Sequence, residues 1–153
     1  MKKELGVMGV GTKIVVPVAV CIVITGLISY FTYPFFRIAE DYNILLIIGI
    51  VAAVIGFSFN LAAAFPMLTG FKKGKLVTTG MYRLCRNPMY VFQLFITLPG
   101  LMILFNSWLM LISTIIVGFL AFKILVKEEY EYLLRKFGEE YKSYCSSVLI
   151  KFL

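Results

Sequence analysis

Apolar residues run along this chain in four long stretches that are separated by short polar segments. They extend over residues 14–33, 44–68, 89–105 and 107–126. A helix that crosses a bilayer needs about 20 mostly apolar residues, within a range of about 17–25. The pattern therefore predicts four transmembrane helices. The third is the shortest and is expected to bend at Pro99. Almost no loop separates the third and fourth stretches, which predicts a tight helical hairpin.

A second apolar pattern follows the fourth stretch. Apolar and aromatic side chains recur at steps of three and four, as on one face of a helix. They are Tyr130, Leu133, Leu134, Phe137, Tyr141, Tyr144 and Val148. The polar face carries five glutamates, whereas helices that lie on a membrane surface favour a basic polar face. We therefore expect a C-terminal amphipathic helix that folds back onto the protein, with Gly138 allowing close approach of a ligand or another backbone.

Composition supports a membrane protein. The 153 residues are 61% hydrophobic and have a mean hydropathy of +0.93, whereas soluble domains are about 45–50% apolar. The length suits one membrane-embedded domain over residues 1–153. Four long apolar stretches in succession do not resemble a cleavable signal, so no removable presequence is expected. The fold class predicted is all-α, with four transmembrane helices and a cytoplasmic amphipathic helix.

Basic residues are distributed unevenly between the polar segments. Three lie in the N-terminal tail, one in the first loop, five in the second loop, none in the third loop and six from Lys123 onward. Positive residues favour the cytoplasmic side of a membrane. Both termini and the second loop are therefore expected in the cytoplasm. The net charge of +7 follows from this bias and favours anionic lipid headgroups rather than nucleic acid.

Cysteine and histidine usage narrows the chemistry. The chain has three cysteines, no CxxC pair and no histidine. A disulfide framework and a metal site such as zinc are therefore not expected. Polar chemistry must use the second loop, the C-terminal tail and the few polar residues within the apolar stretches. Among the last, Asn60 and Gln93 suit either interhelical hydrogen bonds or a pocket.

The second loop ends in the sequence MYRLCRNPMY, residues 81–90. Asn87 is a favoured N-cap residue and Pro88 suits the first helical position, so the third helix is expected to begin here. Its free N–H groups, together with Arg86, could hold an anion. The alternative is ordinary anchoring at the interface, where arginines extend towards water and tyrosines lie among headgroups.

Two motifs together resemble those of the membrane-embedded methyltransferases, which include isoprenylcysteine carboxyl methyltransferases and phospholipid N-methyltransferases. The loop motif comprises Gly80, Tyr82, Arg83, Arg86, Asn87, Pro88 and Tyr90. The tail motif comprises Glu129, Leu133, Phe137, Gly138, Tyr141, Tyr144 and Val148. The chain departs from the family pattern in four places. Asn87 replaces a frequent histidine, Phe92 replaces a glycine, the glutamate pair is one residue out of register, and no Pro-Arg follows Val148.

The resemblance implies S-adenosylmethionine as cofactor, bound between the loop motif and the tail helix at the cytoplasmic face. Arg86 and the start of the third helix suit its carboxylate, and Glu128 or Glu129 suits its ribose or ammonium group. Aromatic side chains could stack on the adenine or face the sulfonium. The cofactor-binding residues expected are Tyr82, Arg86, Asn87, Pro88, Tyr90, Glu128, Glu129, Phe137 and Tyr141.

The methyl acceptor is expected to be hydrophobic or lipid-like. A carboxylate needs only a cation to orient it, for which Lys123 and Arg135 are the candidates, whereas an amine must lose a proton. The lack of histidine favours a carboxylate of the isoprenylcysteine type. Phospholipid N-methylation, a non-enzymatic membrane protein that binds lipid or partners, and a membrane reductase remain open. The departures from the motifs are compatible with an altered substrate or with a loss of activity. The oligomeric state does not follow from the sequence.

Overall fold

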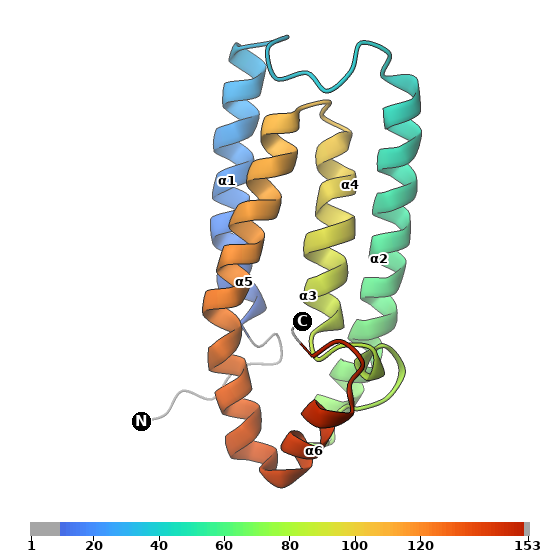
Figure 1. The fold of residues 1–153 in the computed structure, drawn as a ribbon, viewed down its shortest axis with the longest axis vertical. Helices are drawn as coiled ribbons and strands as arrows, with labels where there is room; N and C mark the ends of the chain where they lie inside the picture. The colour runs from blue at the N-terminus through green and yellow to red at the C-terminus, as the bar shows by residue number, and fades with distance from the viewer. Residues whose placement is uncertain (1–9, 152–153) are drawn as a thin grey trace.

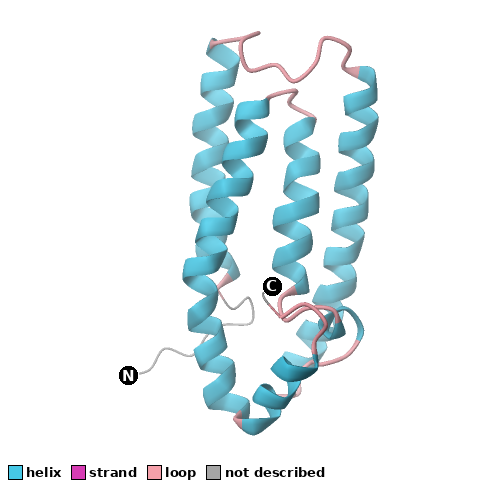
Figure 2. Cartoon of the chain, in the orientation of Figure 1, coloured by secondary structure: helices cyan, strands magenta, loops and turns pink. Residues whose placement is uncertain are grey.

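The protein is helical throughout the part that the structure describes. The structure is a computed structural model that describes residues 10–151, apart from the side chains of residues 71 and 72. Lys2 and Lys3, which contribute to the predicted orientation, lie outside these residues. Helices joined by loops make up the described chain (Figure 2), and its only β-pairing is two isolated bridges.

The helices form four columns, which stand roughly parallel (Figure 1). The helix α1 packs against α5, whereas α2 packs against the broken column formed by α3, η2 and α4. A short 3₁₀ helix, η1, lies in the second loop, and α6 follows α5 at the lower end of the view. The elements are α1 (Gly11–Phe31), α2 (Asn43–Lys72), η1 (Gly80–Arg83), α3 (Pro88–Phe92), η2 (Gln93–Thr97), α4 (Leu98–Ile103), α5 (Trp108–Phe137) and α6 (Glu139–Ser147).

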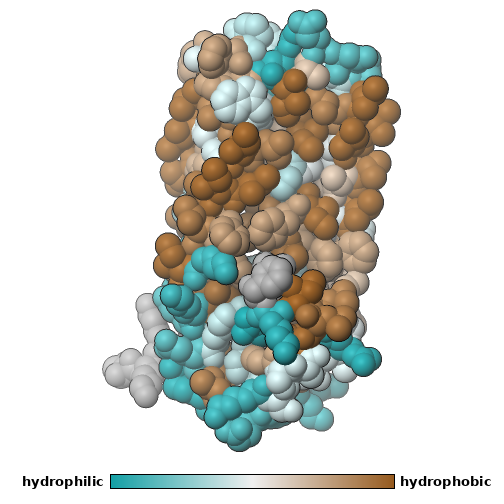
Figure 3. All heavy atoms as spheres, viewed as in Figure 1, coloured by the Kyte–Doolittle hydropathy of each residue, from teal (hydrophilic) through white to brown (hydrophobic). Residues whose placement is uncertain are grey.

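Three of the described helices, α1, α2 and α5, are long and apolar enough to cross a membrane. Figure 3 shows the hydrophobic band that covers most of the visible face, with hydrophilic residues gathered at both ends. The third column, Pro88–Ile103, is a shorter apolar helix. It would be about 24 Å long at 1.5 Å per residue, against a hydrocarbon core of about 30 Å. Three of the four predicted spans therefore meet the length criterion, and the fourth stays a prediction.

The third column begins at Pro88, as the Asn87-Pro88 pair predicts, and its helix is interrupted just before Pro99. A bend at Pro99 itself stays a prediction. Residues Gln93–Thr97 form a π-helical turn, and Pro99 lies in the first turn of α4. A proline lacks the N–H of the helical ladder, and its ring collides with the carbonyl four residues earlier. The wider π-turn precedes the proline and places the irregularity at Gln93–Thr97, beside α2.

Glycines allow α2 and the third column to approach closely. A Cβ added at Gly56 would lie 2.7 Å from the backbone nitrogen of Thr97, and one at Gly100 would lie 2.7 Å from that of Ala53. Such contacts involve backbone atoms, which a change of rotamer cannot move. Small residues at helix crossings are how membrane helices gain van der Waals contact.

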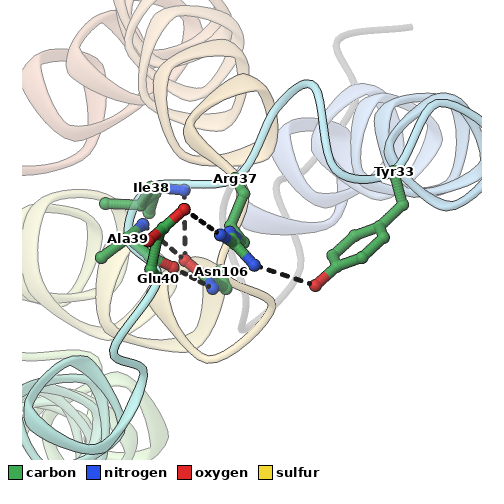
Figure 4. Close-up of polar contacts among 6 residues, drawn as sticks. All are labelled: Tyr33, Arg37, Ile38, Ala39, Glu40 and Asn106. Carbon is green, nitrogen blue, oxygen red and sulfur yellow. Dashed lines mark hydrogen bonds and ion pairs between the residues drawn. The ribbon is translucent and has the colours of Figure 1, made fainter.

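At the opposite end from α6, the first loop is fastened to the turn between α4 and α5 (Figure 4). The Asn106 carboxamide oxygen accepts hydrogen bonds from the backbone nitrogens of Ile38 and Ala39, both at 3.1 Å, and its nitrogen donates to the Ala39 carbonyl at 3.0 Å. Arg37 donates to Glu40 at 3.0 Å beside it. Only four residues separate α4 from α5, which confirms the predicted tight hairpin.

The C-terminal pattern is divided between two helices instead of forming one. The helix α5 continues to Phe137, Gly138 adopts φ +52° and ψ −121°, and α6 then turns back. A Cβ at Gly138 would have no protein atom within 4 Å, so this glycine serves the backbone conformation and not the close approach of another backbone. Close approach of a ligand stays a prediction. The turn packs Tyr141, Tyr144 and Val148 into a cluster with the second loop, so the tail does fold back onto the protein.

Candidate functional site

A cavity of about 790 Å³ lies where the second loop, α6 and the four columns meet. Ligand cavities in proteins typically measure about 300–1,000 Å³. One part of the wall is polar and aromatic, and comprises Tyr82, Arg86, Asn87, Tyr90, Glu129, Tyr132, Tyr141 and Tyr144. Another part is mostly apolar, and includes Ile14, Val15, Val18, Ala19, Ile22, Leu94 and Leu98 beside the carboxamides of Asn60 and Gln93.

The second loop and the tail are joined along a seam of hydrogen bonds. The Tyr144 hydroxyl donates to the Tyr82 carbonyl at 2.8 Å. The backbone nitrogen of Ile150 donates to the Leu84 carbonyl at 2.8 Å, next to a bridge between Ile150 and Cys85. Burial, and to a smaller extent the Glu129 carboxylate, raises the pKa of Tyr82 above its usual range, so this phenol stays protonated at the cavity wall.

Arg86 lies at the junction of the loop, the tail and α5. One terminal nitrogen donates to the Lys151 carbonyl at 2.6 Å, and the guanidinium carbon lies 4.5 Å from the centre of the Tyr130 ring. Its Nε is buried and has no hydrogen-bond partner among residues 10–151. A buried donor without a partner is uncommon and calls for an acceptor. Because Arg86 borders the cavity, an anionic ligand there could supply one.

Asn87 does not cap the third column through its side chain, contrary to the sequence-based expectation. The side chain makes no capping hydrogen bond. Its carboxamide nitrogen donates instead to the Tyr130 hydroxyl at 2.5 Å and ties the second loop to α5. The backbone carbonyl of Asn87 does accept from Val91 at 3.1 Å and so begins the helix. Pro88 occupies the first helical position as predicted, but it is buried and outside the cavity lining.

The two neighbouring glutamates of α5 point to different surroundings. Glu129 borders the cavity, accepts a hydrogen bond from the Tyr90 hydroxyl at 2.8 Å and accepts another from the backbone nitrogen of Val10 at 3.4 Å. Glu128 forms an ion pair with Lys13, and both side chains are about half exposed. Of the two glutamates proposed from the sequence, the structure brings only Glu129 to the cavity.

Comparison with known proteins identifies the family of this chain. A family model described as phospholipid methyltransferase matches residues 42–140, which is more than half of the chain. The chain belongs to the phospholipid methyltransferase family. No curated protein and no solved structure gave a match. Family membership makes this a membrane methyltransferase, in agreement with the loop and tail motifs.

In this phospholipid methyltransferase family member, the two cations expected to orient the acceptor lie away from the cavity. Lys123 is exposed, with its Nζ 5.5 Å from the centre of the Phe119 ring. Arg135 is exposed and pairs with Glu131 at 3.6 Å. Neither side chain belongs to the cavity wall, so an orienting role for them stays a prediction that this geometry does not favour.

Two wall residues of α5 were missed by the sequence reasoning. Tyr132 and Lys136 border the cavity together with Leu133 and Phe137. They lie three and seven residues after Glu129, which is the spacing of one helical face. Helical phase, counted from Glu129, would have identified both, whereas selecting residues by charge led to Arg135.

Proposed function

We propose that this protein transfers a methyl group from S-adenosylmethionine to the head group of a lipid-like acceptor at the cytoplasmic interface. The observation that carries the proposal is a cavity with both a polar and an apolar wall. The polar wall suits a charged cofactor and a head group, and the apolar wall suits an acyl or prenyl chain. Family membership supports the reaction class.

The polar wall offers hydrogen-bond donors that fit the anionic and polar groups of the cofactor. Two buried atoms there, Arg86 Nε and the Tyr141 hydroxyl, have no ordinary hydrogen-bond partner among the described residues. Arg86 would hold the carboxylate of the cofactor, and the carboxylate of Glu129 would accept from its ammonium or ribose. Phe137 and Tyr82 also border the cavity, where aromatic faces attract a sulfonium. The bound cofactor supplies an electrophilic methyl group.

The apolar wall gives a route for the acceptor. The helix α1 packs against α5, and α2 packs against the third column, while residues of both α1 and α2 line the cavity. An acceptor chain would therefore enter from the bilayer between α1 and α2, with its head group held at the polar wall. Such holding places the attacking atom against the methyl carbon and excludes water, which is the main demand of a displacement reaction.

The geometry favours an amine head group over the carboxylate that the sequence suggested. Lys123 and Arg135 are outside the cavity, whereas Glu129 is part of its wall, although Lys75 and Lys136 also line the cavity and could attract a carboxylate. Where Glu129 faces the acceptor instead of the cofactor, its carboxylate would attract an ammonium group and take its proton, after which the nitrogen lone pair attacks the methyl carbon while the carbon–sulfur bond breaks. Tyr90 donates to Glu129 and would fix its orientation. Acceptors with a carboxylate head are the second candidate.

The test uses purified protein in lipid nanodiscs. S-adenosylmethionine binding is measured by calorimetry, with NADPH as the control ligand. Methyl transfer from labelled cofactor is then measured to phosphatidylethanolamine, to a prenylated cysteine analogue and to a water-soluble carboxylic acid. We expect transfer to the phospholipid. Transfer to the prenyl carboxylate alone would contradict the amine head group, and transfer to the soluble acid alone would contradict entry from the bilayer. Binding of NADPH but not of S-adenosylmethionine would contradict the reaction class.

Neighbouring carboxylates provide a matched pair of variants. Arg86→Ala and Glu129→Ala should each weaken cofactor binding. A hydrogen bond to a charged group contributes about 1.5–3 kcal/mol, which corresponds to about 10- to 150-fold in affinity. Glu128→Ala removes the same charge one residue away and should leave binding unchanged. If all three folded variants bind S-adenosylmethionine with the affinity of the unmodified protein, Arg86 and Glu129 do not belong to the site.

A further inference from the structure

A pair of carboxamides lies in the wall of the cavity, within the columns. The Asn60 nitrogen donates to the Met89 carbonyl at 3.1 Å and to the Gln93 carboxamide oxygen at 3.1 Å. A backbone carbonyl only accepts hydrogen bonds, so Asn60 must present its nitrogen to Met89. The same nitrogen also faces Gln93, so Gln93 must accept this hydrogen bond through its carboxamide oxygen. The orientation of both carboxamides is therefore fixed by the Met89 carbonyl, although oxygen and nitrogen are alike in shape.

This arrangement leaves the Gln93 nitrogen with its two hydrogens unused. It makes no hydrogen bond to any residue between 10 and 151, and surrounding atoms do not bury it. Gln93 borders the cavity next to Leu94 and Leu98, and Val18 of α1 belongs to the same wall. An amide donor without a partner is costly in apolar surroundings. Gln93 is also the first residue of the π-turn, a feature frequently found at functional sites.

We propose that the Gln93 carboxamide is a subsite for a neutral carbonyl oxygen in the acceptor, such as the ester carbonyl of a glycerolipid. The inference rests on the proposed function, because it concerns the same cavity. Gln93 follows Tyr90 by three residues, which is about 4.5 Å along a helix. If the head group of the acceptor is held beside Glu129 and Tyr90, the ester carbonyls that join the head group to the hydrocarbon chains would lie at the level of Gln93.

The chemistry of the wall selects a carbonyl over other groups. The free Gln93 atoms are donors, and an ester carbonyl is an acceptor only, so the two are complementary. A charged group at this level would face the apolar side chains of α1 and the third column without a counter-charge, which is expensive within a membrane. An acceptor with bare hydrocarbon at this position would leave the Gln93 donors unpaired and should bind less well.

The experiment compares two lipids that differ only in this oxygen. Diacyl phosphatidylethanolamine and its dialkyl ether analogue, with equal chains, displace a fluorescent phospholipid from the purified protein, without cofactor. A neutral hydrogen bond contributes about 0.5–1.5 kcal/mol, so the diacyl lipid should bind about 2- to 13-fold more tightly. The double variant Asn60→Leu/Gln93→Met removes both carboxamides and leaves neither without a partner. It should bind the two lipids equally.

Leu98→Met, which changes an apolar wall residue to another apolar one, is the control and should retain the preference for the diacyl lipid. Equal displacement by both lipids in the unmodified protein would overturn the subsite, as would an unchanged preference in the double variant. Because displacement needs no methyl transfer, a preference that depends on Gln93 can be found even if every transfer assay is negative. That result would contradict the proposed reaction and not the subsite.

Discussion

Gly138 decides whether the C-terminal segment bends under the cavity or continues straight. Its φ of +52° and ψ of −121° lie outside the regions that residues with a Cβ adopt. Such backbone strain costs about 1–3 kcal/mol in a residue other than glycine, and alanine gains about 1 kcal/mol over glycine in a straight helix. Gly138→Ala should therefore shift the balance towards the straight form by about 2–4 kcal/mol, or roughly 30- to 900-fold.

The contacts of α6 decide how this shift will be seen. The segment buries Tyr141, Tyr144 and Val148, and each fully buried apolar side chain contributes about 1.5–3 kcal/mol. These contributions exceed the strain, so α6 should stay docked for most of the time in Gly138→Ala. It should nevertheless open more often than in the unmodified protein. Hydrogen exchange of the amides in Glu139–Ser147 should accelerate by the same factor, provided that the segment recloses faster than it exchanges.

Two further variants test whether the turn depends on the glycine at position 138. Asparagine tolerates the left-handed helical region, where ψ is about +47°, but not the observed ψ of −121°. Gly138→Asn should therefore accelerate exchange as alanine does. Ser143→Ala, at an exposed position of α6, should leave exchange unchanged. Unaltered exchange in Gly138→Ala would show that the turn does not depend on glycine.

Three other predictions concern the columns and the orientation. Gly56→Ala places a Cβ 2.7 Å from the Thr97 nitrogen and should lower the free energy of unfolding by about 1–3 kcal/mol. The control Gly26→Ala, whose Cβ has its closest contact at 3.5 Å to the flexible Met110 side chain, should not lower it. Denaturant titration in detergent compares the two variants. Asn106→Gly can keep the positive φ of 49° but loses three hydrogen bonds of about 0.5–1.5 kcal/mol each, so it should destabilise the protein. Asn106→Ala should destabilise it further, because alanine is strained at a positive φ. Equal stability of Asn106→Gly and the unmodified protein would contradict this prediction. Single cysteines at Lys73 and Ser146 should be protected from an impermeant reagent in intact cells, and one at Glu40, whose side chain is 93% exposed, should react; labelling at Lys73 without permeabilisation would contradict the predicted orientation.

The helical layout could be predicted because its signals are local. Apolar length located the columns α1, α2 and α5, and the Asn87-Pro88 pair located the start of the third column. The turn at Gly138 could not be predicted in this way, because the three-and-four spacing continues through it. A glycine within such a pattern is compatible with a helix, a bend or a close approach. Only the backbone angles of the folded chain distinguish these possibilities.

The cavity-wall residues of α5 follow helical phase, whereas the resemblance left Glu128 and Glu129 as alternatives and charge alone led to residues outside the wall. Glu129 follows the buried residues Phe122 and Val126 at steps of seven and three, which places it on the inward face of α5. Glu128, Lys123 and Arg135 were proposed for their charge and are exposed or half exposed on other faces. The partner of Asn87 was also beyond the sequence, because Tyr130 is brought to it only by the packing of the second loop against α5.

The family match ends at residue 140 and begins at residue 42, yet the cavity is completed by segments on both sides of that range. The helix α1 supplies much of the apolar wall, and Tyr141 and Tyr144 of α6 supply part of the polar wall. Glu129 lies within the matched range and accepts from the Val10 nitrogen at the start of α1. The carboxylate that would hold the cofactor or the acceptor head group therefore also fixes the helix that would guide the acceptor chain. A change of position at the Val10 end of α1 would reach Glu129 directly, so we expect differences in acceptor choice to arise in α1 and α6 more than in the matched segment.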